Sequence, residues 1–202
     1  MRTSAGTQER SSTGFGVIFV CFFLSGATGL IYQVVWLRLL GLVFGHTVYA
    51  ITTVLAAFMG GLALGSFVFA RYAARIQNLI RAYGWIEIGI GVYCALLPLL
   101  LMLVSYLYLG LHYTLGFSYD TFNVIQFLLI FALLLVPTTL MGGTLPVLSQ
   151  ALVEDDAGLG QKVGTLYAVN TTGAVLGVVL AGYFLLPLLG NRVTIALAAS
   201  PM

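Results

Sequence analysis

The chain has 202 residues, of which 60% are hydrophobic and only 7% are charged, and its formal net charge is +2. Soluble domains carry about 25% charged residues, so this composition excludes an ordinary soluble fold and predicts a chain whose surface faces the lipid bilayer. The small net charge gives no indication of a nucleic-acid partner.

The first part of the chain differs from the rest. Residues 1–14 are small, polar and rich in Ser and Thr, and we predict that they form a flexible cytoplasmic segment. Apolar residues then continue from residue 15 to residue 44. The apolar region of a cleaved signal peptide has about 15 residues at most, so this segment is expected to remain as a transmembrane helix.

Five apolar segments are long enough to cross the hydrocarbon core, which takes about 20 helical residues. They are residues 15–44, 48–70, 83–107, 122–148 and 163–189. Residues 193–199 are too few to span and are expected to begin a sixth helix. The predicted fold is therefore an all-α integral membrane bundle of five transmembrane helices (residues 15–190), followed by a stub of a truncated sixth (residues 191–202).

The positions of Lys and Arg predict the orientation. One side of the predicted bundle holds Arg2, Arg10, Arg71, Arg75, Arg81 and Lys162, whereas the other side holds Arg38 and Arg192. Cytoplasmic loops carry an excess of these residues. We therefore expect a cytoplasmic N-terminus, in a multi-pass protein of the inner (cytoplasmic) membrane of a bacterium.

Small residues recur every four positions in two of the predicted helices: Ala57, Gly61 and Gly65 in the second, and Gly173, Gly177 and Ala181 in the fifth. Such strips let two helix backbones approach closely inside a membrane. They are typical of static packing, within the bundle or against a partner subunit. The alternative is the sliding interface of a transporter.

The fourth segment contains two prolines and a glycine pair: Pro137, Gly142, Gly143 and Pro146. Proline removes a backbone donor and clashes with the preceding turn, so we predict a kink or a break in this helix. Broken helices in transporters bind substrates or ions at their exposed ends. Alternatively, the hydroxyl groups of neighbouring threonines satisfy the carbonyl groups that the prolines free.

Four polar residues are candidates for an intramembrane or substrate site: Gln33, Arg38, Glu87 and Asn170. Ionisable groups at membrane depth are costly and often functional. Arg38 is expected at the outer end of the first helix, with Tyr32 and Trp36 as interfacial anchors.

Glu87 is expected about one turn inside the cytoplasmic end of the third helix. An ion pair with Arg71, Arg75 or Arg81 is the simpler interpretation, and a proton or cation site is the alternative.

Cofactor sites are not indicated. His46 and His112 could ligate a haem or a metal, but two isolated histidines are more typical of ordinary interfacial residues. Cys21 and Cys94 each lie in an apolar run and are expected to be buried thiols. We expect no resident cofactor, although lipids or pigments of a partner could bind.

Sequence motifs of common enzyme sites are missing: the chain has no phosphate-binding loop, no G-x-S-x-G and no H-E-x-x-H. No enzymatic activity is therefore expected.

Several blocks of the sequence together resemble the membrane region of membrane-fused spermidine synthase-like (polyamine aminopropyltransferase) proteins. They are residues 25–38 (SGATGLIYQVVWLR), 44–50 (FGHTVYA), 57–66 (AFMGGLALGS), 137–148 (PTTLMGGTLPVL) and 164–174 (GTLYAVNTTGA). The resemblance implies a transporter-like region, similar to half of a major-facilitator bundle, joined to a cytosolic synthase domain.

The chain departs from that family in one respect. The Gly-rich nucleotide-binding loop and acidic residues of a synthase domain do not follow residue 190, so no catalytic residue or cofactor carries over. The favoured function is a non-catalytic membrane subunit or scaffold that packs against other membrane proteins. A transporter-like protein for small cations or polyamines, and a membrane anchor for a separate aminopropyltransferase, are the alternatives.

Overall fold

The computed structural model describes residues 5–44, 47–115, 119–152 and 159–199, and this part of the chain is almost entirely helical, with no strand. The elements are α1 (Ala5–Phe44), α2 (Thr47–Tyr72), a 3-10 turn (Ala73–Arg75), α3 (Leu79–Leu115), α4 (Tyr119–Ala151), α5 (Leu159–Leu180), a π-helical turn (Ala181–Leu185) and α6 (Leu186–Ala199). The predicted all-helical fold is confirmed for these residues.

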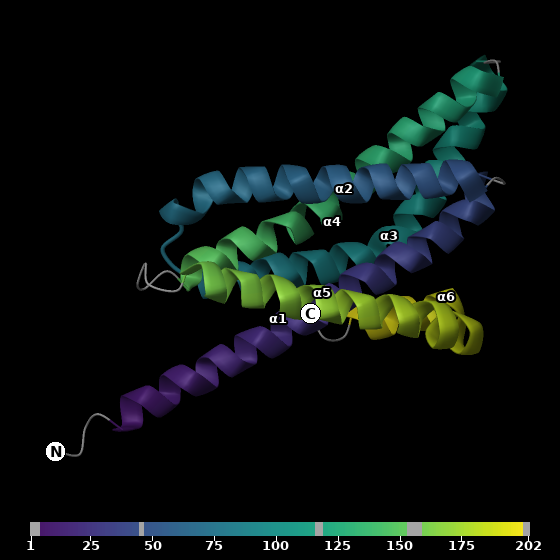
Figure 1. Ribbon diagram of the computed structural model, residues 1–202. Helices are drawn as coiled ribbons and strands as arrows, with labels where there is room; N and C mark the ends of the chain where they lie inside the picture. Colours follow the sequence, from purple (N-terminus) through teal and green to yellow (C-terminus); the bar gives the residue numbers. More distant parts are fainter. Residues whose placement is uncertain (1–4, 45–46, 116–118, 153–158, 200–202) are drawn as a thin grey trace.

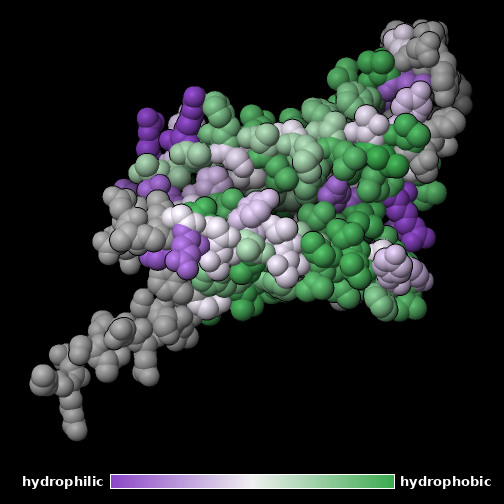
Figure 2. Space-filling view, in the orientation of Figure 1, coloured by the Kyte–Doolittle hydropathy of each residue, from purple (hydrophilic) through white to green (hydrophobic). Residues whose placement is uncertain are grey.

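Five stretches are long and apolar enough to cross a membrane: Gly16–Leu42, Val48–Arg75, Leu79–Leu107, Asn123–Ala151 and Gly160–Asn191. They correspond to the five predicted segments. Hydrophobic side chains cover most of the visible surface in Figure 2, and hydrophilic ones gather toward its two ends, at the left where α2 ends and α5 begins and in smaller groups at the right. These features indicate a multi-pass membrane protein.

Successive helices run in opposite directions, so α1, α3 and α5 are parallel to one another, as are α2 and α4 (Figure 1). The closest packing joins α2 to α4 and α1 to α5, and α3 packs mainly against α4. The bundle is thus built from two tight parallel pairs, with α3 alongside.

The α2–α4 contact is close because small residues line it. A Cβ atom at Gly61 would overlap the Thr138 side chain, and one at Gly65 would overlap the Thr139 carbonyl oxygen. On α4, a Cβ atom at Gly142 would likewise overlap the backbone of Leu62. Because the two helix backbones lie so close together, they make favourable dispersion contacts. Such contacts stabilise helix association in a membrane, where lipid provides no hydrophobic driving force for it.

The small residues near this contact also include Ala57 and Gly143. Ala57 is fully buried, and its carbonyl oxygen accepts a hydrogen bond of 3.1 Å from Thr138 Oγ1. A Cβ atom at Gly143 would overlap the Phe69 ring. Each small residue of this strip therefore leaves room for a group of the facing helix.

The α1–α5 contact is close for the same reason, because small residues line it. A Cβ atom at Gly173 would overlap the Phe23 carbonyl oxygen, and one at Gly177 would overlap the Ala27 carbonyl oxygen. Ala181 is fully buried at the start of the π-helical turn.

The predicted break in the fourth segment is not present, because α4 is one continuous helix through Pro137 and Pro146. Proline deprives the carbonyl four residues earlier of its helical donor. The Leu133 carbonyl instead accepts from the Tyr93 hydroxyl at 2.9 Å, and the Gly142 carbonyl accepts from the Ser66 hydroxyl at 3.0 Å. Neighbouring helices therefore satisfy the freed groups, and the backbone has no need to unwind.

Tyr32 and Trp36 are not interfacial anchors. Trp36 is only 1% exposed and Tyr32 is fully buried, and their rings stack with centroids 6.0 Å apart. The two residues are one turn apart on α1, so they share the face that packs into the core. This aromatic pair is part of the bundle interior.

The fifth span bends near its end. Gly190 has φ 73 and ψ 178, a conformation that favours glycine, and the chain changes direction there. Arg38 is exposed and donates from Nη1 to the Leu186 carbonyl oxygen at 3.4 Å. A cation beside a helix C-terminus is favourable, so Arg38 has a structural role at this bend.

Candidate functional site

Glu87 lies inside the bundle and close to one end of α3. It is eight residues after Leu79, about 12 Å along the helix axis. The Glu87 side chain is only 6% exposed and adjoins Tyr83, one turn earlier on α3, and Ser25 of α1. Among the described residues, neither Glu87 Oε1 nor the Tyr83 hydroxyl makes a hydrogen bond of good geometry, and Ser25 and Tyr83 are the polar groups close enough to interact with the carboxyl group. The site therefore contains two buried polar atoms that lack a well-formed hydrogen bond to the described residues.

The predicted ion pair of Glu87 with a neighbouring arginine is not formed. Arg71 lies over the Phe67 ring at 4.1 Å, and Arg75 lies over the Tyr72 ring at 5.6 Å. Arg81 is exposed. The guanidinium groups stay at the polar end of the bundle, where they keep their hydration, while Glu87 lies deeper.

A cavity of about 250 Å³ opens beside Glu87, between α1 and α3. Its polar lining is formed by Cys21, Ser25, Tyr83 and Glu87. Its apolar lining comes from Val17, Ile18, Leu24 and Ile80. The cavity combines one carboxyl group and two hydroxyl groups with walls suited to a hydrocarbon group.

A second, smaller cavity of about 80 Å³ lies where α1, α2, α4 and α5 meet. Ser25, Thr144 and Asn170 are its polar residues. Asn170 lies against Gly26, where a Cβ atom would overlap the Asn170 carbonyl oxygen. Ser25 lines both cavities, so their polar linings adjoin at this residue.

The predicted site residues are thus only partly brought together. Glu87 and Asn170 lie on two sides of the same turn of α1. Gln33 is buried two turns farther along α1, and Arg38 caps Leu186 still farther away. Sequence reasoning missed Ser25 and Tyr83. The four-residue spacing of Tyr83 and Glu87 was a usable signal, since it places both on one helix face.

Metal and cofactor ligands do not cluster among the residues that the structure describes. Cys94 is buried as predicted, but Cys21 is exposed and lines the Glu87 cavity, so the prediction of a buried thiol is wrong for Cys21. Cys21 lies beside the gap between α1 and α3 instead of in a closed contact. His46 and the side chain of His112 fall outside the described part of the chain.

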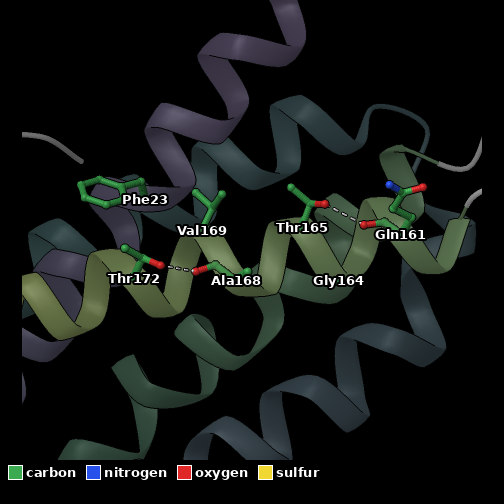
Figure 3. Close-up of a pocket in the computed structure, with 7 residues that line it drawn as sticks. All are labelled: Phe23, Gln161, Gly164, Thr165, Ala168, Val169 and Thr172. Carbon is green, nitrogen blue, oxygen red and sulfur yellow. Dashed lines mark hydrogen bonds between the residues drawn. The ribbon is translucent and has the colours of Figure 1, made fainter.

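A shallow hollow of about 540 Å³ follows the first half of α5 (Figure 3). Phe23 of α1 borders it, and its other lining residues all come from α5: Gln161, Gly164, Thr165, Ala168, Val169 and Thr172. The Thr165 hydroxyl donates to the Gln161 carbonyl and the Thr172 hydroxyl to the Ala168 carbonyl, each at 2.8 Å. The two threonine hydroxyls are therefore satisfied as donors within the helix.

No protein family, curated protein or solved structure was found to match this chain. The two cavities and the α5 hollow are therefore the basis on which a function can be proposed.

The two kinds of site differ in chemistry. The Glu87 cavity offers hydrogen-bond acceptors in an apolar setting, which suits a ligand with a charged donor group. The α5 hollow is lined mostly by small side chains along a helix, and its two threonine hydroxyls donate within that helix. A surface of this kind suits a second helix.

Proposed function

We propose that this chain is a non-catalytic integral membrane subunit that packs against a transmembrane helix of a partner membrane protein through the first half of α5. The observation that carries this proposal is the exposed strip of Gly164, Ala168 and Thr172, which forms the floor of the 540 Å³ hollow. These residues recur every four positions, the spacing at which small residues let two helices approach.

The same helix provides an internal comparison. Gly173 and Gly177 lie on an adjacent side of α5, where the backbone of α1 packs directly against them. The exposed strip offers the same small-residue surface, but α1 and the other described helices leave it open. One side of α5 therefore serves packing within the chain, and the other is suited to packing with a partner.

The exposed surface of α3 has a different composition. Its exposed residues are large and apolar: Trp85, Ile88, Val92, Leu96 and Leu99. Side chains of this kind fill the space between acyl chains and need no protein neighbour. The small and hydroxyl-bearing strip of α5 lacks that bulk, which favours a helix over lipid as its neighbour.

The N-terminus of this subunit is placed in the cytoplasm in our proposal. The end of α2, the following turn and the start of α3 carry Arg71, Arg75 and Arg81. These segments lie at the end of the bundle from which α1 enters (Figure 1). The positive-inside rule assigns this end to the cytoplasm. The similarity to spermidine synthase-like fusions also supports an origin in their membrane part.

A transporter-like function is the second candidate, because Ser25 lines both cavities and so connects Glu87 to Asn170. The half-helix ends that a broken α4 would have exposed are not available to it. Uptake of a small organic cation into reconstituted vesicles, abolished by Ser25→Leu, would favour this candidate over the subunit.

The subunit proposal is tested by the mass of the complex extracted from its own membrane into polymer nanodiscs. We expect one stoichiometric partner with the wild-type chain, and its loss with Ala168→Phe, which fills the hollow without touching the core. Val92→Phe, on the exposed side of α3, is the matched control and is expected to retain the partner. A lone monomer in the wild-type extract would contradict the proposal.

A further inference from the structure

The carboxyl group of Glu87 is buried without a charge partner among the described residues. The side chain is 6% exposed, its Oε1 atom accepts no hydrogen bond, and Arg71 and Arg75 lie over aromatic rings instead. An uncompensated polar group at this depth is costly. The arrangement is therefore suited to a partner that the described residues do not supply.

We propose that the Glu87 cavity binds a primary ammonium group. Such a group has three N–H donors and one positive charge. The cavity presents three matching oxygens, which belong to the Glu87 carboxyl, the Tyr83 hydroxyl and the Ser25 hydroxyl. The Tyr83 hydroxyl makes no hydrogen bond of good geometry with the described residues. The charge of the ligand meets the carboxylate, and the two hydroxyl oxygens accept the remaining donors.

The walls of the cavity indicate what is attached to the ammonium group. Val17, Ile18, Leu24 and Ile80 surround the polar end, and the volume is about 250 Å³. A water molecule occupies about 30 Å³ in the liquid, so the space accommodates several carbon atoms. The ligand class is therefore a primary ammonium on an aliphatic chain, either free or as the headgroup of a lipid.

Other cations fit this donor set less well. Calcium takes about six to eight oxygen ligands, and the described residues contain no cluster of three metal-ligating side chains. A quaternary ammonium is held by several aromatic faces. Among the described residues, Tyr83 is the only aromatic one that lines this cavity, and its ring packs edge-on with Phe22, with centroids 6.4 Å apart. A primary ammonium is the cation that uses all three oxygens.

The binding test uses n-butylammonium and the full chain in phosphatidylcholine nanodiscs, whose lipid has no N–H donor. We expect saturable binding by calorimetry, weakened at least tenfold by Glu87→Gln, since one charge-assisted hydrogen bond is lost. Tyr83→Phe is expected to weaken binding by several-fold, and Thr165→Val on α5 is expected to leave it unchanged. Unchanged affinity in Glu87→Gln, or no binding to the wild-type chain, would overturn the proposal.

A ligand series on the wild-type chain gives a test that needs no variant to fold. Neutral 1-butanol and butyltrimethylammonium, which lacks N–H donors, are expected to bind at least tenfold more weakly than butylammonium. Equal binding of either compound would overturn the proposal. Both tests are independent of the α5 interface, because Ala168→Phe should not alter butylammonium binding.

A further experiment, which changes the lipid of the nanodisc, distinguishes a soluble amine from a lipid headgroup as the source of the ammonium group. If butylammonium binds more weakly in nanodiscs that contain phosphatidylethanolamine, the lipid headgroup competes for the cavity and is the occupant. If its affinity is the same in both lipids, the occupant is a soluble amine. Either result supports the shared ammonium chemistry.

Discussion

The Tyr93 hydroxyl donates a 2.9 Å hydrogen bond to the Leu133 carbonyl, which Pro137 leaves without its helical donor. The bond joins α3 to α4 across 40 residues of sequence. It explains how α4 passes through a proline and remains a continuous helix, and it ties α3 to the α2–α4 pair.

Tyr93→Phe is therefore expected to destabilise the bundle, because the Leu133 carbonyl would be left without any donor. Hydrogen bonds between membrane helices contribute about 0.6 kcal/mol on average and at most about 1.7 kcal/mol, and we expect a loss in this range. The free energy of unfolding in a detergent titration measures it. Tyr106→Phe, at an exposed position of the same helix, is the matched control and should have no effect.

A double-mutant cycle isolates the role of the proline. Pro137→Ala restores a backbone N–H to the helix, so Tyr93→Phe should cost less in that background than in the wild-type chain. Equal costs in the two backgrounds would show that the hydroxyl does not replace the missing helical donor.

Neighbouring glycines of α2 are expected to respond in opposite ways to alanine. Gly61→Ala would drive a methyl group into the Thr138 side chain, and overpacking of this kind costs about 1–3 kcal/mol. At Gly60 the nearest atom to a new Cβ is Phe131 Cζ at 3.9 Å, an ordinary contact. Gly60→Ala should therefore be neutral or slightly stabilising, since alanine favours a helix.

Comparing the unfolding free energies of the two variants tests the packing of α2 against α4. Equal effects of Gly61→Ala and Gly60→Ala would contradict the close contact at Thr138, because only one of the two glycines lies at that contact.

The orientation can be tested with single cysteines in a chain whose native cysteines are replaced. Gln77, between α2 and α3, is expected to be protected from a membrane-impermeant maleimide in intact cells, because the arginine-rich end faces the cytoplasm. Thr121, near the start of α4, is expected to be labelled. Labelling of Gln77→Cys with protection of Thr121→Cys would reverse the proposed orientation.

The helices were predictable from sequence because each apolar run is longer than the membrane requires, and length alone decides such segments. The continuity of α4 was not predictable. Pro137 and Pro146 show which donors are lost, but Tyr93 and Ser66, which replace them, lie far away in the sequence.

The candidate site was likewise only partly predictable from the sequence. Glu87 stands out in an apolar run, and Tyr83 is visible one turn before it. Ser25 is an ordinary serine in the sequence, and only the packing of α1 against α3 and α5 gives it a place in both cavities. Likewise, the positions of Tyr32 and Trp36 in the sequence suggested an interfacial belt, whereas the side of α1 on which they lie makes them core residues.

The central claim is that the first half of α5 contacts a partner helix, and site-specific photo-cross-linking in the native membrane tests it most directly. A photoreactive amino acid at Ala168 is expected to give one discrete protein adduct, which Gly164→Phe on the same strip abolishes, while the same probe at Val92 gives only lipid adducts. If the probe at Ala168 also gives only lipid adducts, the α5 strip faces the bilayer and the proposed interface does not exist.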